Sequence, residues 1–233
     1  MKAVKVRESA AIGMAPRKVR KPKRPETYHH GSLKEALLQA AERILEREGI
    51  QGLTLRAAAR EAGVSHAAPK NHFGDLAGLL SELAAVGFNR FVATMRAGVG
   101  EGDSPDRRME AIGRGYVAFA RAHPGLFLLM FRGERLDFTR PSLRAAVDAS
   151  SGALSGAVAA RSGEKVEAGL TLAQAASIIG PWSLVHGFAM LLLDGRLKPL
   201  MARLPAGTDA DALLGAVLRG AKPGRPPEAG GSA

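Results

Sequence analysis

The chain has 233 residues, of which 46% are hydrophobic and only 5% aromatic, and it carries a net charge of +11. This length allows one or two globular domains, and the alanine- and leucine-rich composition favours helices. The chain has no cysteine, which excludes a disulfide framework and a thiolate metal site, and its N-terminus lacks the apolar stretch of a secretory signal peptide. We therefore expect a helix-rich cytoplasmic protein.

The positive charge is concentrated at the N-terminus. Residues 1–25 hold nine basic residues, one acidic residue and three prolines, and so carry +8 of the net charge. A segment of this composition cannot bury enough apolar surface to fold, so residues 1–27 are predicted to form a disordered basic arm. Two readings stay open: the arm neutralises DNA phosphates and adds salt-sensitive affinity, or it is a solvated tail without a site-specific role.

Residues 32–49 predict an amphipathic helix. Ser32 and Glu35 have the spacing of a capping box, and apolar residues recur every three or four positions from Leu33 to Leu45. Gly49 is a suitable helix end because glycine readily adopts the left-handed conformation. This helix is expected to support the two that follow.

The stretch from Thr54 to Phe73 predicts two short helices joined by a tight turn. Thr54 is a suitable cap for the first helix, which carries one stripe of small apolar residues, and Gly63 is placed to leave it in a left-handed conformation. Ser65 is predicted to cap a second helix, His66 to His72. A short second helix with small and polar residues at its N-terminal end suits insertion into the DNA major groove, as in a helix-turn-helix.

The predicted DNA contacts are the polar and small residues of this segment: Thr54, Ser65, His66, Ala67, Ala68, Lys70, Asn71 and His72. Backbone amides at the two helix starts can hold phosphates. Small side chains such as Ala67 and Ala68 can touch thymine methyl groups. Pro69, predicted to be the fourth helical residue, removes only the first intrahelical bond but disfavours the helical conformation of Ala68, so a slightly irregular helix is expected.

Residues 28–92 resemble the TetR family of bacterial transcriptional regulators, through Tyr28–Gly49, Leu55–Ser65 and His72-Phe73. The family usually has Leu-Tyr where this chain has Pro69-Lys70, so a lysine would replace a tyrosine that typically touches the DNA backbone. The resemblance implies a helix-turn-helix DNA-binding domain over residues 28–97. It also implies repression relieved by a small-molecule effector in the C-terminal domain, and a homodimer paired through the last two long helices.

A longer helix is predicted to link this unit to the rest of the chain. It begins after a cap at Asp75 and continues to the glycine-rich stretch 98–103, where we place the domain boundary. Ser104-Pro105 then starts a helix that ends at His123-Pro124. The run 126–131 is wholly apolar, so it is expected to be buried or to line a cavity.

The C-terminal domain, residues 104–220, is predicted to contain three more helices. One starts at Pro141 or Ser142, and another runs from Leu172 to Leu193 behind a capping box of Thr171 and Gln174. The latter helix is apolar nearly all round, and Gly180-Pro181 should kink it. A membrane span is the rival reading, but the proline, serine and histidine inside the run favour a buried helix or one shared with a partner subunit. After a last helix, 208–219, residues 221–233 are predicted to be a disordered tail.

Two histidines and three aromatic residues are the predicted ligand-binding residues of this domain: Phe119, His123, Phe127, Trp182 and His186. Trp182, His186 and Gly187 resemble the Trp-His-Gly signature of one TetR subgroup. Aromatic rings with a few polar groups suit a small apolar or amphipathic ligand. The alternative is that both histidines are satisfied core or helix-terminal groups. No metal site is expected at these histidines or at the adjacent pair His29-His30.

The sequence lacks the nucleophile-and-base arrangements of an enzyme, so catalysis is not expected and no cofactor is implied. An architectural DNA binder is a further alternative, since a basic arm alone would serve it, but such a protein does not need a large apolar C-terminal domain. The prediction is therefore an all-α, two-domain homodimer of about nine helices. Its expected partners are a double-stranded DNA operator and an unknown small-molecule effector, with no membrane.

Overall fold

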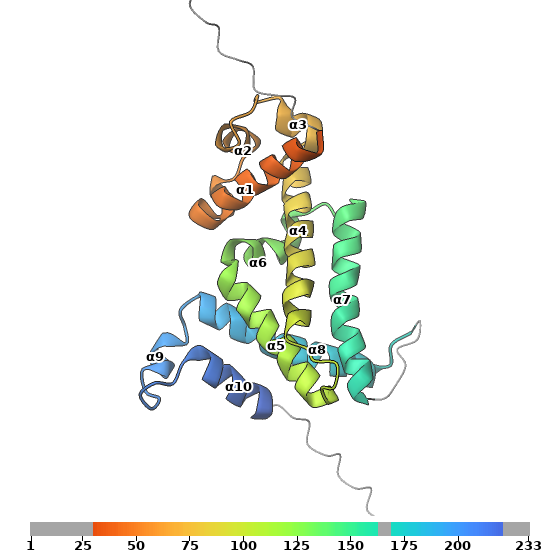
Figure 1. Ribbon diagram of the computed structural model, residues 1–233, viewed down its shortest axis with the longest axis vertical. Coiled ribbons are helices and arrows are strands. Elements are labelled where there is room, and N and C mark those ends of the chain that lie inside the picture. The colour runs from red at the N-terminus through yellow and green to blue at the C-terminus, as the bar shows by residue number, and fades with distance from the viewer. Residues whose placement is uncertain (1–29, 163–168, 221–233) are drawn as a thin grey trace, which may run out of the picture.

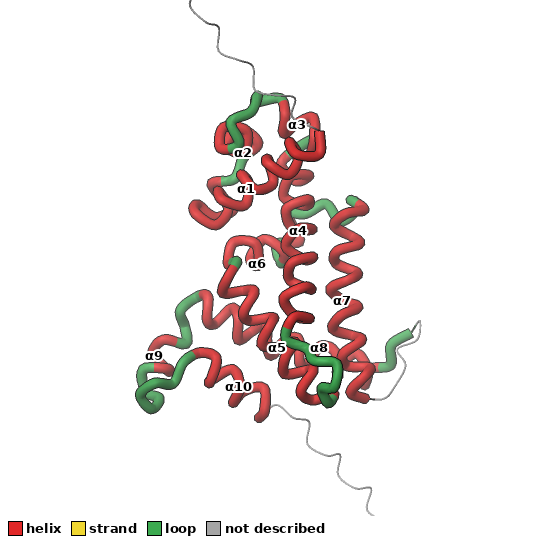
Figure 2. The backbone as a smooth tube through the Cα atoms, viewed as in Figure 1, coloured by secondary structure: helices red, strands yellow, loops and turns green. Residues whose placement is uncertain are grey.

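The computed structural model describes residues 30–162 and 169–220. This part of the chain forms ten α-helices and one 3₁₀ helix and contains no strand (Figure 2). The predicted all-α fold is therefore confirmed. The predicted number of about nine helices is one short, because α9 (Lys198–Met201) forms a single additional turn. The basic arm and the C-terminal tail lie outside the described residues.

Helices α1 (His30–Gly52), α2 (Leu55–Glu61) and α3 (Ala68–Phe73) form a unit at one end of the molecule (Figure 1). α1 begins two residues before the predicted cap at Ser32, so that residue lies inside the helix. Gly49 breaks the helix with φ 70°, as predicted, and a further turn reaches Gly52. Small buried residues let these helices approach closely, since Ala41 of α1 and Ala58 of α2 are both completely buried.

Helix α4 (Leu76–Ala97) connects this unit with the rest of the molecule. The Asp75 carboxylate accepts a hydrogen bond from the Gly78 amide (2.8 Å), which confirms the predicted cap. α4 contacts α1 and α3 and also packs against α5, α6 and α7. Figure 1 shows it running from the N-terminal unit through the middle of the remaining helices. A single hydrophobic core therefore joins both parts of the chain.

Three helices cover α4: α5 (Pro105–Ala122), α6 (Pro124–Met130) and α7 (Pro141–Ser162). The hydroxyl of Ser104 accepts from the Arg107 amide (3.4 Å), as the predicted start of α5 requires. The 3₁₀ helix η1 (Gly133–Arg135) follows α6. Four residues of the apolar run 126–131 are at most 2% exposed, which confirms the predicted burial for these four, whereas Leu128 is 37% exposed.

Helices α8 (Leu172–Leu193) and α10 (Ala210–Gly220) complete the C-terminal part. The predicted capping box of Thr171 and Gln174 is present, with bonds of 3.0 and 3.2 Å. α8 passes through Pro181 as one helix, so the kink there stays a prediction. The carboxylate of Asp209 accepts from the Ala212 amide (2.7 Å), and α10 therefore starts two residues later than predicted.

Candidate nucleic-acid interface and ligand cavity

Helices α2 and α3 are held in a defined helix-turn-helix by local hydrogen bonds. The hydroxyl of Thr54 accepts from the Ala57 amide (3.0 Å) and caps α2, as predicted. Gly63 has φ 67°, a conformation that glycine adopts without a steric penalty. The amide of Val64 then donates to the Ala59 carbonyl (3.0 Å), and Val64 packs against the core. These contacts fix the angle at which α3 leaves the turn.

The start of α3 differs from the prediction. α3 begins at Ala68 after an N-cap at Ala67, which makes no side-chain capping bond. Ser65 is not the cap; its carbonyl instead accepts from the Ala68 amide (3.0 Å) in a turn before the helix. Pro69 is thus the second helical residue rather than the fourth. An amide at that position has no intrahelical partner, so the proline costs no helical hydrogen bond.

Most of the predicted DNA contacts lie on the outer surface of the helix-turn-helix. Those that are exposed are Thr54, Ser65, His66, Ala67, Lys70 and Asn71, while His72 is half-buried. Ala68 is only 8% exposed and belongs to the hydrophobic core. Its predicted contact with a thymine methyl is therefore corrected to a packing role. Ala67, its neighbour, keeps a surface position.

Two arginines on α2 extend this surface and were not predicted. Arg56 and Arg60 are one helical turn apart and exposed, and neither has an ion pair within the described residues. Basic residues beside a recognition helix are suited to phosphate contacts. Their i, i+4 spacing on the first helix of the motif was the sequence signal for them.

A polar cluster connects the end of α3 with the start of α7. The guanidinium of Arg140 donates from Nη2 to the carbonyl of Phe73, the last residue of α3 (2.6 Å). A cation at this position satisfies a helix-terminal carbonyl and complements the negative end of the helix. Gly78 makes room for the contact, because a Cβ atom there would lie 2.3 Å from Arg140 Nη2.

Glu82 of α4 lies at the centre of the same cluster. It accepts from Lys34 Nζ of α1 (2.8 Å) and from the Ser142 hydroxyl of α7 (2.8 Å), and it lies 3.8 Å from Arg140 Nη1. Burial alone would raise the pKa of Glu82, but these hydrogen bonds outweigh it and hold that pKa below its usual value. Four helices, α1, α3, α4 and α7, thus meet in one network of hydrogen bonds and an ion pair.

A second polar contact joins α1 to α6. The carboxylate of Glu46 accepts from the amides of Gly125 (2.9 Å) and Leu126 (3.1 Å) at the start of α6. A carboxylate there satisfies two unpaired helix amides and complements the positive end of the helix. The N-terminal unit is therefore tied to the C-terminal part by two polar connections as well as by the core.

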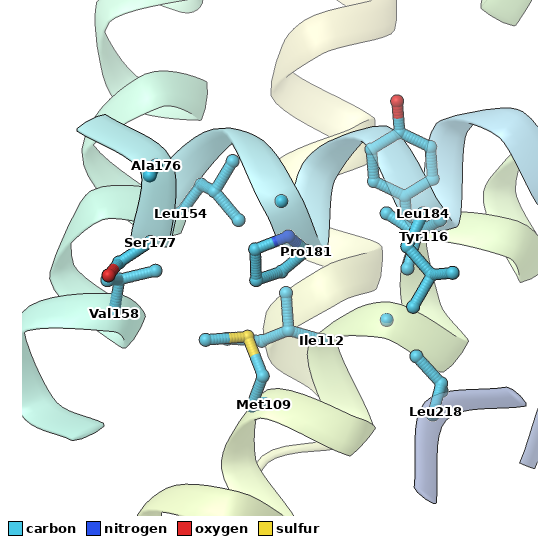
Figure 3. A pocket seen from close by; sticks show the side chains of 13 residues that line it. Met109, Ile112, Tyr116, Leu154, Val158, Ala176, Ser177, Pro181, Leu184 and Leu218 are labelled. Carbon is cyan, nitrogen blue, oxygen red and sulfur yellow. The ribbon is translucent and has the colours of Figure 1, made fainter. Parts of the chain in front are cut away.

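The C-terminal part contains a cavity of about 640 Å³ that lies between four helices and is partly open to solvent (Figure 3). Its walls include Met109, Ile112 and Tyr116 of α5, Leu154 and Val158 of α7, Ser177, Pro181 and Leu184 of α8, and Leu218 of α10. Cavities of roughly 300–1,000 Å³ with apolar walls are typical of small-molecule sites. The arrangement is thus suited to a small ligand of mostly apolar character.

None of the five predicted ligand-binding residues lines this cavity within the described chain. Phe119 and Phe127 are at most 1% exposed and fill the core, so their predicted ligand contacts are corrected to packing. The ring of His123 packs against Phe119, with 5.1 Å between ring centroids. For His123, which lies between the end of α5 and the start of α6, the alternative of a helix-terminal histidine describes the structure better.

Trp182 and His186 do not line the cavity but contact one of its wall residues, Tyr116. The hydroxyl of Tyr116 lies 2.8 Å from His186 Nδ1 and accepts a hydrogen bond from Trp182 Nε1 (3.3 Å). Burial lowers the pKa of His186 and raises that of Tyr116. With His186 neutral, the tyrosine hydroxyl can donate to Nδ1. Tyr116 was not predicted as a cavity residue, although its spacing from Met109 and Ile112 places all three on one face of a helix.

An exposed helix-turn-helix at one end and a ligand-sized apolar cavity at the other define a helical DNA-binding protein with a small-molecule domain. Two family models match the chain: the bacterial regulatory proteins of the tetR family over residues 37–83, and the tetracyclin repressor-like C-terminal domain over residues 109–220. The chain therefore belongs to the TetR family of transcriptional regulators. Members bind DNA through the N-terminal domain and small molecules through the C-terminal one.

Solved structures share the fold of this chain. A protein of unknown function from Rhodococcus sp. RHA1 is 36% identical, with a TM-score of 0.65 over 84% of this chain and 98% of that one. The TetR family regulator PfmR from Thermus thermophilus is 17% identical, with a TM-score of 0.54 over 80% and 98%. The regulator FadR from Bacillus subtilis, in complex with stearoyl-CoA, is 16% identical, with a TM-score of 0.58 over 79% and 95%. No curated protein matches the chain.

Proposed function

We propose that this protein is a homodimeric repressor that binds a palindromic operator and is released from it by a small molecule held in the C-terminal cavity. The observation that carries the proposal is the placement of Arg140. It contacts the last carbonyl of α3 (2.6 Å) and directly precedes α7, whose Leu154 and Val158 line the cavity. Helix α7 and the arginine directly before it thus connect the ligand site with the end of the recognition helix.

The proposed release works through the position of α7 and α6 relative to the N-terminal unit. A ligand changes the equilibrium only if it binds the arrangement that does not fit DNA better than the one that does. A shift of α7 displaces Arg140 and thereby the end of α3, while a shift of α6 acts on α1 through Glu46. Either displacement changes the separation of two recognition helices in a dimer.

The dimer is proposed to form through α8 and α10. α8 is strongly apolar, yet only 17% of its most apolar window is buried. Leu172 is 89% exposed and Ile179 49% exposed, and an apolar face of this extent needs a partner. Pairing with a second α8 covers these side chains and places two helix-turn-helix units at a fixed distance, as a palindromic site requires.

The small-molecule part of the proposal has separate support. The cavity walls are apolar and come from α5, α7, α8 and α10. The FadR structure, which shares this fold, was solved with stearoyl-CoA. We propose that the effector binds in this cavity and that the protein acts on DNA in the cytoplasm.

Selection of DNA from a random pool tests the proposal most directly. We expect an enriched palindrome whose half-sites lie about 10–10.5 bp apart or slightly more, since one recognition helix of the dimer enters each major groove. Selection of single, unpaired sites would contradict the proposed dimer.

A variant tests the role of Lys70 in the same assay. Lys70→Ala should weaken binding to all sequences similarly and lower the salt slope by about 1, as loss of a phosphate contact does. Arg203→Ala, which removes an exposed charge far along the chain, is the control.

A further inference from the structure

The exposed positions of α3 and its two ends form a single stripe. They have the i, i+3, i+4 and i+7 spacing of one helix face and are Ala67, Lys70, Asn71 and Gly74. Pro69 and Phe73, on the other side of the helix, are buried. Ala67 and Gly74 carry at most a methyl group, so Lys70 and Asn71 supply the hydrogen-bonding side chains of this stripe.

Neither of these two side chains is engaged within the residues that the structure describes. No hydrogen bond or ion pair there involves the ammonium group of Lys70 or the carboxamide of Asn71. In contrast, the carboxylate of Asp75, one turn after Asn71, accepts a hydrogen bond from the Gly78 amide (2.8 Å). The two side chains of the stripe therefore keep their hydrogen-bonding groups for a ligand.

The two side chains differ in what they can recognise. Lys70 has three donors and no acceptor, and together with the exposed Arg56 and Arg60 it supplies cations for the DNA backbone. Asn71 is uncharged and presents a donor and an acceptor side by side. In the major groove, adenine is the base whose edge presents an acceptor, N7, next to a donor, the N6 amino group. The carboxamide of Asn71 is thus complementary to adenine.

The short side chain of Asn71 reaches a base only if the backbone of α3 comes close to the groove floor. The two small neighbours on the stripe permit this approach, since neither Ala67 nor Gly74 adds a long side chain. Gly74 has φ 83°, a conformation that favours glycine, so this end of the stripe stays without a side chain.

We propose that Asn71 reads one adenine in each half-site of the operator, donating from Nδ2 to adenine N7 and accepting at Oδ1 from the N6 amino group. This inference rests on the proposed DNA-binding function and specifies one base of its target. The basic residues hold the phosphates and contribute affinity to any sequence, whereas the carboxamide of Asn71 contributes the preference for adenine.

Parallel selections from a random DNA pool test the inference. The wild-type protein should enrich an adenine at one pair of symmetric positions, and Asn71→Ala should lose the preference there while it keeps the rest of the palindrome. With any other base at that position of one half-site, wild-type binding should weaken roughly 5- to 150-fold, the worth of one bidentate base contact. Loss of the preference in Lys70→Ala or His66→Ala, but not in Asn71→Ala, would assign the reading to another residue and overturn the proposal.

A modified base tests the contact in the wild-type protein, independently of how any variant folds. Replacing the selected adenine of one half-site by 7-deazaadenine removes the N7 acceptor and leaves the N6 amino group. Wild-type binding should weaken roughly two- to tenfold, the worth of one hydrogen bond, and Asn71→Ala should bind both DNAs equally. If wild-type binding is insensitive to this replacement at every adenine of the half-site, the proposed contact does not exist.

Gln39→Ala is the matched control, because it removes an exposed carboxamide from α1. Gln39 lies beside Glu42 and Glu46, which bond to Arg90 of α4 and to the start of α6, so it is on the side of α1 that faces the C-terminal part. This variant should select the wild-type palindrome. If the wild-type protein selects a palindrome without a position that depends on Asn71, the inference is wrong and the regulator remains. If no sequence is selected at all, the proposed function itself fails.

Discussion

Helices α4 and α8 are alike in sequence character and opposite in surroundings. Each has 22 residues and is long and apolar enough to cross a membrane, with mean hydropathies of 1.3 and 1.6 over the most apolar window. In α4, 61% of that window is buried, against 17% in α8. The difference arises because α4 is covered by α1, α3, α5, α6 and α7, whereas α8 packs mainly on α5 and α7. Hydropathy indicates that an apolar helix has to be buried, but it does not indicate whether its own chain or a partner subunit buries it.

The two helices consequently serve different purposes. α4 completes its core inside one chain and connects the helix-turn-helix to the rest of the molecule. α8 has one face on the cavity and exposes Leu172, Ile179 and Leu191 on others. In the proposed dimer, the ligand and the partner subunit therefore meet on the same helix, which makes α8 a natural point at which ligand binding influences the geometry of the dimer.

The largest effect is expected from a cavity in the core around α4. Leu83 is completely buried, so Leu83→Ala should lower the free energy of unfolding by about 2–5 kcal/mol. Chemical denaturation at a fixed protein concentration measures this. Leu128→Ala on α6, where the side chain is 37% exposed, should cost far less. Equal costs at the two positions would show that α4 is not the packed centre of the fold.

The next effect concerns the exposed face of α8. Ile179→Glu should raise the dissociation constant of the dimer by roughly thirtyfold or more, about 2 kcal/mol, because it places an unpaired charge in the proposed interface. Sedimentation at several concentrations measures the change, and circular dichroism should show unaltered helix content. Leu200→Glu on α9 is matched in exposure and should leave the association unchanged. A full-strength dimer with glutamate at position 179 would exclude this face as the interface.

A smaller effect, on operator binding, is expected from Arg140, the residue directly before α7. Arg140→Gln removes the charge at the Phe73 carbonyl and should weaken operator binding by roughly tenfold, about 1.5 kcal/mol, since a charge-assisted bond that positions α3 is lost. Titration of labelled operator measures it. Arg144→Gln, one turn further along α7 and exposed, is the control. If both variants bind DNA like the wild-type protein, Arg140 has no role in positioning α3.

The smallest effect is expected from His186, a partly buried residue of α8. Because burial lowers the pKa of His186, the unfolded chain takes up a proton at a higher pH than the folded one. The stabilising effect is complete above the ordinary histidine pKa of about 6.5 and declines as the pH falls from there toward the lowered pKa. The melting temperature should therefore drop across this window, and His186→Gln should reduce that drop. An identical pH dependence in the variant would remove His186 as its source.

The sequence by itself determined the local features of this protein. The caps at Thr54 and Asp75, the capping box at Thr171 and the left-handed turn at Gly63 all occur as predicted. Each depends on residues within a few positions of one another, so the information is contained in a short segment. The same local consistency made the helix-turn-helix and the all-helical class predictable.

Only the tertiary structure decided which distant residues meet. Arg140 and Phe73 are 67 positions apart, and Tyr116 and His186 are 70 apart, so no spacing rule could connect them. The predicted ligand residues Phe119 and Phe127 instead became core, because α4 and α5 bring other rings against them. Ala68 turned inward for a related reason: the helix start moved past Ser65, and packing against the core determined which face of the short helix remained outside.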